Sequence, residues 1–367
     1  MSEQDAFLAQ AGWGDATVAP LPGDASTRRY ARLTRRSESA MLMHQPQSAE
    51  TPPAPADANE KTRRALGYNA VARLAGADCA RFAAVADYLR GRGLAAPQIH
   101  AADFLRGLAV LEDFGDALFA DVLAEGGSEE DLYKAAVEVL ARLHAQDAPS
   151  HLAEGVPLHA YDEIALIAET DLLPEWFLPL ALDRPATKSE MEEHRALWRD
   201  VLRTVSPTSR VFVHRDYHAQ NLIWMPEREG LARVGLIDFQ DAVAGPRAYD
   251  LVSLMEDARR DVSPAVAEMA TAHYLATMRA QGTPLDETAF RAEMAVMAAQ
   301  RNAKIVGIFA RLYKRDGKSR YLSYLPRVWA HLERDLSHPA LAGLRAWYDR
   351  MIPAALRTLP QIERETA

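Results

Sequence analysis

The sequence predicts an α+β fold in which a small β-rich lobe precedes a larger helical lobe. Segments with strand-like alternation gather before residue 115, and helical periodicity dominates after it, almost without interruption from Tyr249 onward. The chain has 367 residues, which is long for a single hydrophobic core. We therefore expect two lobes, covering residues 1–115 and 116–367.

The first lobe is predicted to be a small mixed sheet with helices packed on it. Alternation in "RYARLT" and "SAMLMHQ" favours strands, and "GDAS" before them supplies a turn that follows a first strand near Thr17. In "QIHAADFLRGLAVLEDFG", Arg106 and Gly107 form the turn between two further strands. The Pro- and Ala-rich stretch at about residues 47–60 is expected to be a loop. Helices are predicted over residues 5–11, 60–76 and 78–93.

The second lobe is predicted to be mostly helical. "SEEDLYKAAVEVLARLHAQ" forms an amphipathic helix in which Ser128 is the N-cap and the following acidic residues suit the positive end of the helix dipole. Further helices are expected around 161–171 and 189–204. Short strands are predicted only at 211–213, 222–224 and 233–237.

Composition and charge argue against several classes of protein. The formal net charge is −9, from 42 Lys and Arg against 51 Asp and Glu, which disfavours a nucleic-acid-binding protein. Cys79 is the single cysteine, so neither an intramolecular disulfide nor a cysteine-based metal site is expected. The first twenty residues lack a signal-peptide pattern, and no apolar run is long enough to span a membrane. A cytoplasmic location is the simplest expectation.

Polar side chains follow two of the predicted short strands. In "VFVHRDYHAQN" a strand runs into Asp216, with Asn221 five residues later, and in "RVGLIDFQ" another strand ends at Asp238. If the strands pair, these three groups converge at one end of a small ribbon. Phosphoryl transfer needs a carboxylate that orients the attacking hydroxyl, and hard oxygen ligands for Mg²⁺. The spacing H-x-D-x4-N also matches the catalytic loop of protein kinases.

Several segments resemble the aminoglycoside phosphotransferase / choline kinase superfamily. "VFVHRDYHAQNLIW", "LIDFQDAVAGPRAYDLVSL" and the two-lobe layout carry this resemblance. More narrowly, "LPGDASTRRYARL", "VLEDFGD" and "QRNAKIVGIFARLYKRDGKSRYL" are similar to the bacterial anomeric kinases of N-acetylmuramate and N-acetylglucosamine in peptidoglycan recycling. The resemblance implies a protein-kinase-like bilobal fold, ATP and Mg²⁺ as cofactors, and a small-molecule sugar as the binding partner, with no nucleic acid or membrane.

The resemblance also implies roles for the residues of the catalytic segment. Asp216 is expected to be the catalytic base, and Asn221 and Asp238 the Mg²⁺ ligands. Asp250 would fix the backbone of the catalytic loop, or else be an exposed acid in the first turn of a helix. His214 is expected to be a buried structural residue.

The nucleotide site that the resemblance implies is less distinctive. The polar turn in "GDASTRRY" can place donors against phosphates, and the backbone of the "EDF" hinge is expected to bind adenine. Kinases usually carry a lysine on the third strand, but "SAMLMHQ" has none. Either Arg28 or Arg29 supplies that charge, or the enzyme relies more on Mg²⁺. The predicted nucleotide-binding residues are Ser26, Thr27, Arg28, Arg29, Glu112, Asp113 and Phe114.

Four residues are candidates for further contacts. Arg215, grouped with the catalytic residues, either pairs with a carboxylate or is solvated, and His218 either contacts substrate or faces solvent. Arg301 and Lys304 lie on a basic helical face that suits the carboxylate and acyl groups of an N-acetylmuramate, unless that face is simply solvated.

Two alternatives to a sugar kinase remain open at this point. An aminoglycoside, choline or homoserine phosphotransferase would share the fold, and the acids at 163, 169, 171 and 175 could line a polycation site. The missing lysine also admits a nucleotide-binding pseudokinase that acts as a regulator.

Overall fold

The computed structural model describes residues 2–22, 28–46, 53–55, 58–75, 79–204 and 210–359. The chain divides into two compact units, one formed by residues 1–159 with 214–244 and the other by residues 160–213 with 245–367. The predicted α+β class is confirmed. The first unit thus includes residues 116–159 and 214–244, and the lobes expected at 1–115 and 116–367 stay a prediction.

The first unit contains a five-stranded antiparallel sheet in the order β1-β2-β3-β5-β4. Side chains alternate between its faces, so that Ala31, Leu33, Ala40 and Leu42 are buried together. Gly107, with φ +67°, forms the predicted turn between the last two strands. The strands are β1 (Thr17–Pro20), β2 (Arg29–Arg35), β3 (Glu38–His44), β4 (Ile99–Asp103) and β5 (Leu108–Glu112).

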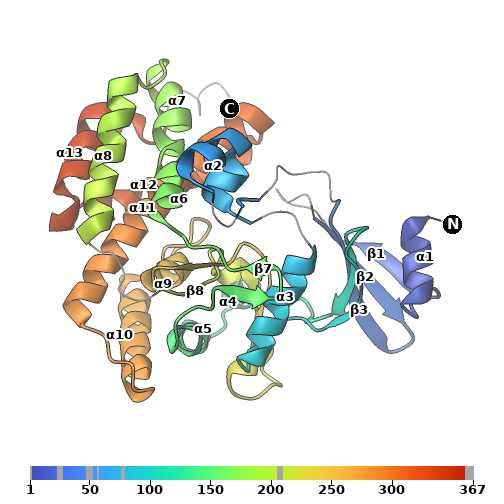
Figure 1. Cartoon of the computed structure of the whole chain (residues 1–367). Coiled ribbons are helices and arrows are strands. Elements are labelled where there is room, and N and C mark those ends of the chain that lie inside the picture. Colours follow the sequence, from blue (N-terminus) through green and yellow to red (C-terminus); the bar gives the residue numbers. More distant parts are fainter. Residues whose placement is uncertain are drawn as a thin grey trace. The chain divides into compact units, whose positions relative to one another are not determined.

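Helix α1 (Glu3–Gln10) covers part of this sheet, as Figure 1 shows beside β1 and β2. A capping box between Ser2 and Asp5 begins the helix. Phe7 and Leu8 are buried in one cluster with side chains of β2, β3 and β5. The turn predicted at Gly23 and Asp24 lies outside the described residues.

The helix predicted over residues 60–76 is interrupted. Helix α2 (Glu60–Leu66) ends at Gly67, whose φ of +102° no other residue type adopts readily. A single π-helical turn, η1 (Asn69–Arg73), follows before α3 (Cys79–Gly91) begins. The positive φ at Gly67 could not be inferred from periodicity, which is why the sequence predicted one continuous helix. Turns of π-helix are rare and occur often at functional sites.

A small ribbon carries the candidate site. Strands β9 (Leu222–Trp224) and β10 (Val234–Leu236) are antiparallel, with Ile223 opposite Gly235. The Leu236 N–H donates to the carbonyl of Ala95 at 2.8 Å, and the Trp224 N–H donates to that of Ala117, also at 2.8 Å. These bonds attach the ribbon to the segments on either side of β4 and β5, which positions the loops at its ends.

Helical segments and minor strands complete the first unit. Ser128 caps α5 as predicted, since its hydroxyl accepts from the Asp131 N–H at 3.2 Å. The strands at 151–153, 156–157 and 243–245 were not predicted. These elements are α4 (Phe119–Ala124), α5 (Glu129–His144), β6 (His151–Ala153), β7 (Val156–Pro157), η3 (Ala219–Asn221), η4 (Gly230–Arg233) and, at the boundary between the units, β11 (Val243–Gly245).

The second unit is helical apart from β8 (Val211–Val213). Its long helix α11 (Glu287–Asp316) approaches the backbone at Leu172 so closely that a Cβ at Gly307 would lie 2.3 Å from the Leu172 carbonyl carbon. Figure 1 shows α8 and α13 side by side in this unit. None of the described helices combines the length and apolar character needed to span a bilayer.

The remaining elements of the second unit are α6 (Glu163–Thr170), η2 (Leu173–Phe177), α7 (Leu178–Leu182), α8 (Lys188–Thr204), α9 (Ala248–Met255), α10 (Pro264–Ala280), η5 (Ser319–Tyr324), α12 (Leu325–Asp335), η6 (Pro339–Leu341), α13 (Ala342–Met351) and η7 (Ala354–Leu356).

Candidate active site

Asp216 and Asn221 are held in one loop that enters the β9–β10 ribbon. The Asn221 amide group donates to the main-chain carbonyl of Asp216 at 2.9 Å, which leaves the carboxamide oxygen to accept a cation or a donor. Both side chains are partly exposed. Within the described part of the chain, the Asp216 carboxylate takes no hydrogen bond, so its oxygens can meet an incoming hydroxyl.

Asp238 lies beside this loop, two residues after β10. The preceding residue, Ile237, donates its N–H to the carbonyl of Asn221 at 3.2 Å, which ties the two segments together. Asp238 has φ +60° and Arg215 has φ +76°, conformations that non-glycine residues adopt at a cost. The structure therefore brings Asp216, Asn221 and Asp238 together, and it places left-handed residues on both segments.

The electrostatics of Asp238 reflect this crowding. Although 44% of its side chain is exposed, the surrounding protein is dense, and desolvation raises the pKa of the Asp238 carboxyl. The negative charges of Asp216 and Asp241 act in the same direction, while the Arg28 guanidinium opposes them. A carboxylate held among like charges gains from a nearby cation.

The residues present fit a divalent cation of the Mg²⁺ type. The Asn221 amide oxygen and the Asp238 carboxylate are hard oxygen donors on adjoining segments. Among the described residues, no group of three or more His, Cys, Asp or Glu side chains could hold a metal ion by itself. A cation here would complete its shell with water and phosphate oxygens, as Mg²⁺ commonly does.

His214 is fully buried at the start of the loop, as expected for a structural residue. Its ring stands edge-on to Tyr217, with centroids 5.6 Å apart, and to Phe239, with centroids 6.5 Å apart. Desolvation lowers the pKa of His214 to about 4, so the imidazole is neutral near pH 7.

Acid is expected to destabilise the protein partly through His214. The ordinary histidine pKa of 6.5 applies to the unfolded chain, whereas the folded pKa is about 4. Between these values the unfolded chain binds a proton that the folded chain does not, so stability is complete above the window and falls as the pH drops through it. The loss is on the order of 3 kcal/mol.

Chemical denaturation across this window tests the expectation. The free energy of unfolding should fall less steeply with acid in His214→Asn than in the wild type. Equal slopes for the two proteins would contradict the assignment.

Arg215 is neither solvated nor at the surface. Its guanidinium donates to the carbonyl of Arg73 at 2.7 Å and to that of Ala72 at 3.2 Å, so it anchors the loop to the π-helical turn η1. Arg73 in turn pairs with Asp241 at 2.7 Å. Burial opposes ionisation of Asp241, but Arg73 and Arg215 outweigh it and hold the pKa of that carboxyl below its ordinary value. Arg73 and Asp241 were not predicted.

Arg81 fixes the segment that follows Asp238 and was also not predicted. This buried side chain donates to three main-chain carbonyls, at 2.9 Å from Gln240, 2.6 Å from Ala242 and 2.6 Å from Pro157. Five donors in a rigid plane suit such multiple acceptors. No sequence signal marks a carbonyl as an acceptor, so this role could be found only from the structure.

The two arginines predicted to bind phosphate differ in environment. Arg28 is 5% exposed and lies 3.3 Å from Asp238, and it also donates to the Gln240 side chain. Arg29, the next residue, is exposed. Of the two, Arg28 is therefore the one that structure places against the candidate metal ligand. The predicted phosphate-binding residues Ser26 and Thr27 lie outside the described residues.

Two arginines brace the predicted hinge. Arg32 pairs with Asp113 at 2.8 Å, and Arg228 pairs with Glu112 at 2.7 Å while lying 4.9 Å from the centre of the Phe114 ring. Within the described ranges, the backbone N–H groups of Asp113 and Phe114 donate no hydrogen bond to another residue. The adenine-binding role of this backbone stays a prediction.

Lys304 and Gln300 belong to a buried polar cluster in the second unit. Lys304 pairs with Glu169 at 2.9 Å and lies 3.3 Å from the Tyr249 hydroxyl. Gln300 donates to the same carboxylate at 3.2 Å, and the Tyr161 hydroxyl also donates to it. The sequence left open whether the helical face with Lys304 binds substrate or is solvated. In the structure, Lys304 packs against Glu169 of α6.

The other predicted residues are also buried. Arg301 is 6% exposed and donates to the Glu256 carbonyl at 3.0 Å. Asp250 is fully buried, so the alternative of an exposed acid is wrong, and its role toward the loop stays a prediction. His218 is 7% exposed and lies 3.3 Å from the Asn221 amide, which excludes a solvent-facing ring.

The two-stranded ribbon, the loop with Asp216 and the antiparallel sheet together define a phosphotransferase of the protein-kinase-like fold. The chain belongs to the Phosphotransferase enzyme family, which it matches over residues 17–285. It is 45% identical over 358 residues to the N-acetylmuramate/N-acetylglucosamine kinase of Caulobacter vibrioides, covering 96% of each protein. It is 32% identical to the enzyme of the same name from Pseudomonas aeruginosa, covering 92% of this chain and 90% of that one.

Solved structures show the same fold at low identity. The microcompartment-associated aminopropanol kinase has a TM-score of 0.57 at 15% identity, and the alignment covers 93% of this chain and 99% of that one. The ADP-bound aminoglycoside phosphotransferase APH(2'')-Ib has a TM-score of 0.55 at 12% identity, covering 91% and 97%. These likenesses concern the fold alone.

Proposed function

We propose that this phosphotransferase is an ATP- and Mg²⁺-dependent kinase that phosphorylates the anomeric hydroxyl of N-acetylmuramate, N-acetylglucosamine or both. The observation that supports the acceptor most directly is the 45% identity to an N-acetylmuramate/N-acetylglucosamine kinase across 96% of both chains. The convergence of Asp216, Asn221 and Asp238 supports the phosphoryl-transfer chemistry.

In the proposed reaction Asp216 accepts the proton of the sugar O1 hydroxyl as O1 attacks the γ-phosphorus. The bond from that phosphorus to the bridging oxygen breaks, and ADP leaves. Asn221 and Asp238 would hold Mg²⁺, which supplies charge neutralisation for the phosphates. His214, Arg215 and Arg81 orient the two segments that carry these groups. The anomeric hydroxyl is more acidic than an ordinary alcohol, so a single carboxylate base suits it.

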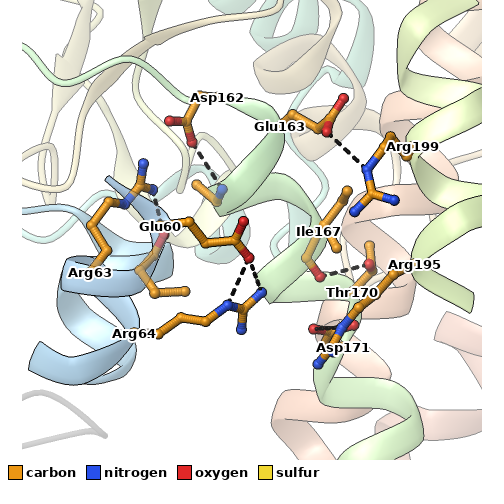
Figure 2. Close-up of polar contacts among 12 residues, drawn as sticks. Glu60, Arg63, Arg64, Asp162, Glu163, Ile167, Thr170, Asp171, Arg195 and Arg199 are labelled. Atoms are coloured by element: carbon orange, nitrogen blue, oxygen red, sulfur yellow. Dashed lines mark hydrogen bonds and ion pairs between the residues drawn. The ribbon is translucent and has the colours of Figure 1, made fainter. Parts of the chain in front are cut away.

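A polycationic acceptor such as an aminoglycoside has less support. Three of the four acids that could have lined its site face cations of their own chain. Glu163 pairs with Arg199 at 3.3 Å and Asp171 pairs with Arg195 at 2.8 Å, as Figure 2 shows. Glu169 is buried against Lys304. Neutralised carboxylates offer little attraction to a polycation. A regulator without turnover is also less supported, because the base and both proposed ligands are present.

Blocking O1 tests the proposed acceptor. Free N-acetylglucosamine and N-acetylmuramate should be phosphorylated, whereas their methyl glycosides should not, and phosphorus NMR should show an acid-labile glycosyl phosphate. Equal turnover of the methyl glycosides, or a product with phosphate on O6, would refute the anomeric assignment and leave the kinase assignment standing. Preferential phosphorylation of kanamycin or choline would favour the alternative acceptors.

A further inference from the structure

Arg28 contacts Asp238, the carboxylate that is proposed to bind the metal ion. Its guanidinium lies 3.3 Å from the Asp238 carboxylate and donates to the Gln240 side chain, whose own amide donates to the same Asp238 oxygen at 3.0 Å. The side chain is 5% exposed. A buried guanidinium remains charged and is costly without an anion, so Arg28 needs a negative partner in every state of the protein.

Strand β3 lacks the cation that phosphotransferases of this kind usually place near the nucleotide phosphates. The sequence of β3, "ESAMLMH", contains neither lysine nor arginine. Arg28 directly precedes β2, the neighbour of β3, and follows the turn predicted to meet phosphates. It is therefore placed to supply this charge.

The Asp238 carboxylate cannot pair with Arg28 and bind a divalent cation at the same time without strong repulsion between the two cations. A metal ion bound at the carboxylate would repel the guanidinium at short range, and a second anion would compensate Arg28 for the loss of this contact. The nucleotide phosphates are that anion if they arrive with the metal. Without nucleotide, a metal ion has to displace Arg28 from the Asp238 carboxylate with no phosphate to take its place, which opposes binding.

We propose that Arg28 occupies Asp238 in the nucleotide-free protein and moves to the phosphates when Mg²⁺ and nucleotide bind together, so that free metal is excluded from the site. This inference rests on the proposed function, because it assumes the metal-ligand role of Asp238. It adds that one arginine makes the binding of metal and nucleotide interdependent. A permanent structural ion pair between Arg28 and Asp238 is the contrasting possibility.

Metal binding measured without nucleotide distinguishes the proposed movement of Arg28 from a permanent Arg28–Asp238 ion pair. Mn²⁺ serves as the probe, and its binding to wild type, Arg28→Met and the control Arg35→Met is followed by electron paramagnetic resonance. Arg35 is the last residue of β2, the strand that Arg28 directly precedes, and it pairs with Glu38 at 2.6 Å near the surface. We expect Arg28→Met to bind Mn²⁺ on the order of tenfold more tightly than wild type. The same variant should bind the Mg²⁺ complex of a non-hydrolysable ATP analogue on the order of tenfold more weakly in calorimetry. Arg35→Met should change neither affinity.

If Arg28 moves from Asp238 to the phosphates, its replacement should raise the affinity for Mn²⁺ and lower the affinity for the Mg²⁺–nucleotide complex. If Arg28→Met leaves Mn²⁺ affinity unchanged, or lowers both affinities, Arg28 is a structural partner of Asp238 and the inference is wrong. Arg28→Lys covers the case in which the methionine variant does not fold. It keeps the positive charge but lacks the planar fork that contacts both Asp238 and Gln240. It should therefore admit free Mn²⁺ more readily than wild type while retaining more nucleotide affinity than the methionine variant, and wild-type Mn²⁺ affinity would contradict the proposal.

These measurements are independent of the acceptor. They contain no sugar, so a wrong acceptor assignment would not affect them. Loss of Mn²⁺ binding in Asp238→Asn, together with unchanged Mn²⁺ binding in Arg28→Met, would support the metal site. It would refute only the proposed role of Arg28. Undiminished Mn²⁺ binding in Asp238→Asn would instead refute the metal-ligand role on which the inference rests.

Discussion

Replacing Asp216 with asparagine is expected to abolish phosphoryl transfer and leave the binding of Mg²⁺ and nucleotide nearly unchanged. The side chain is the one carboxylate of the candidate site without an arginine partner among the described residues, which suits a group that accepts a proton from the acceptor. General-base catalysis typically contributes about 10²–10⁴-fold. We therefore expect turnover to fall by roughly 10³-fold or more. Asparagine keeps the shape of the residue, so the loop should remain intact.

Two measurements check this result. Turnover is compared with that of Asp200→Asn, a surface change in α8 that should behave as the wild type. Calorimetric titration with a non-hydrolysable ATP analogue and Mg²⁺ should give an affinity within about twofold of the wild type. Near-normal turnover in Asp216→Asn would remove the residue from its proposed role. A large loss of nucleotide affinity would show that its charge matters for binding.

Asp238→Ala is expected to weaken binding and turnover together. Its carboxylate faces the cation Arg28 and lies near the negative charges of Asp216 and Asp241, so the site favours a positive charge at this position. Without the carboxylate, Mg²⁺ loses one of two proposed protein ligands. We expect the Mg²⁺ concentration for half-maximal rate to rise by about tenfold or more, with partial rescue at high Mg²⁺.

The metal dependence of the rate is the decisive observation for Asp238. Rates are measured over a range of Mg²⁺ concentrations at saturating nucleotide, for the variant and the wild type. An unchanged Mg²⁺ dependence would mean that Asp238 is not a ligand, whatever the loss in maximal rate. Thermal unfolding of both proteins controls for the loss of the Arg28 ion pair.

The sequence predicted the candidate catalytic and metal-binding residues better than the residues that hold their segments in place. Asp216, Asn221 and Asp238 follow short apolar strands, and this local pattern was enough to infer that they converge. Arg73 and Arg81 left no such signal, because their acceptors are a distant carboxylate and distant carbonyls. The hydrogen bonds of Arg81 span 76 to 161 positions along the chain, far beyond any local period.

The fold was predicted where periodicity is strong and missed where backbone geometry decides. Strands of the first sheet and most long helices follow apolar spacing that the sequence displays. The break at Gly67 depends on a left-handed backbone, and the missed strands β6, β7 and β11 depend on their pairing partners. The basic helical face with Lys304 was predicted from the sequence, but its contact with Glu169 of another helix could not be.

The reach of Arg81 has a consequence for how the enzyme acquires activity as it folds. The Arg81 side chain donates to carbonyls at positions 157, 240 and 242, so its bonds can form only after these distant segments have been brought together. Contacts of such high sequence separation form late, because loop-closure entropy opposes them until other interactions are in place. During refolding, helical content should therefore return before catalytic competence. A molecule released early from folding would carry every catalytic residue and still lack an assembled site.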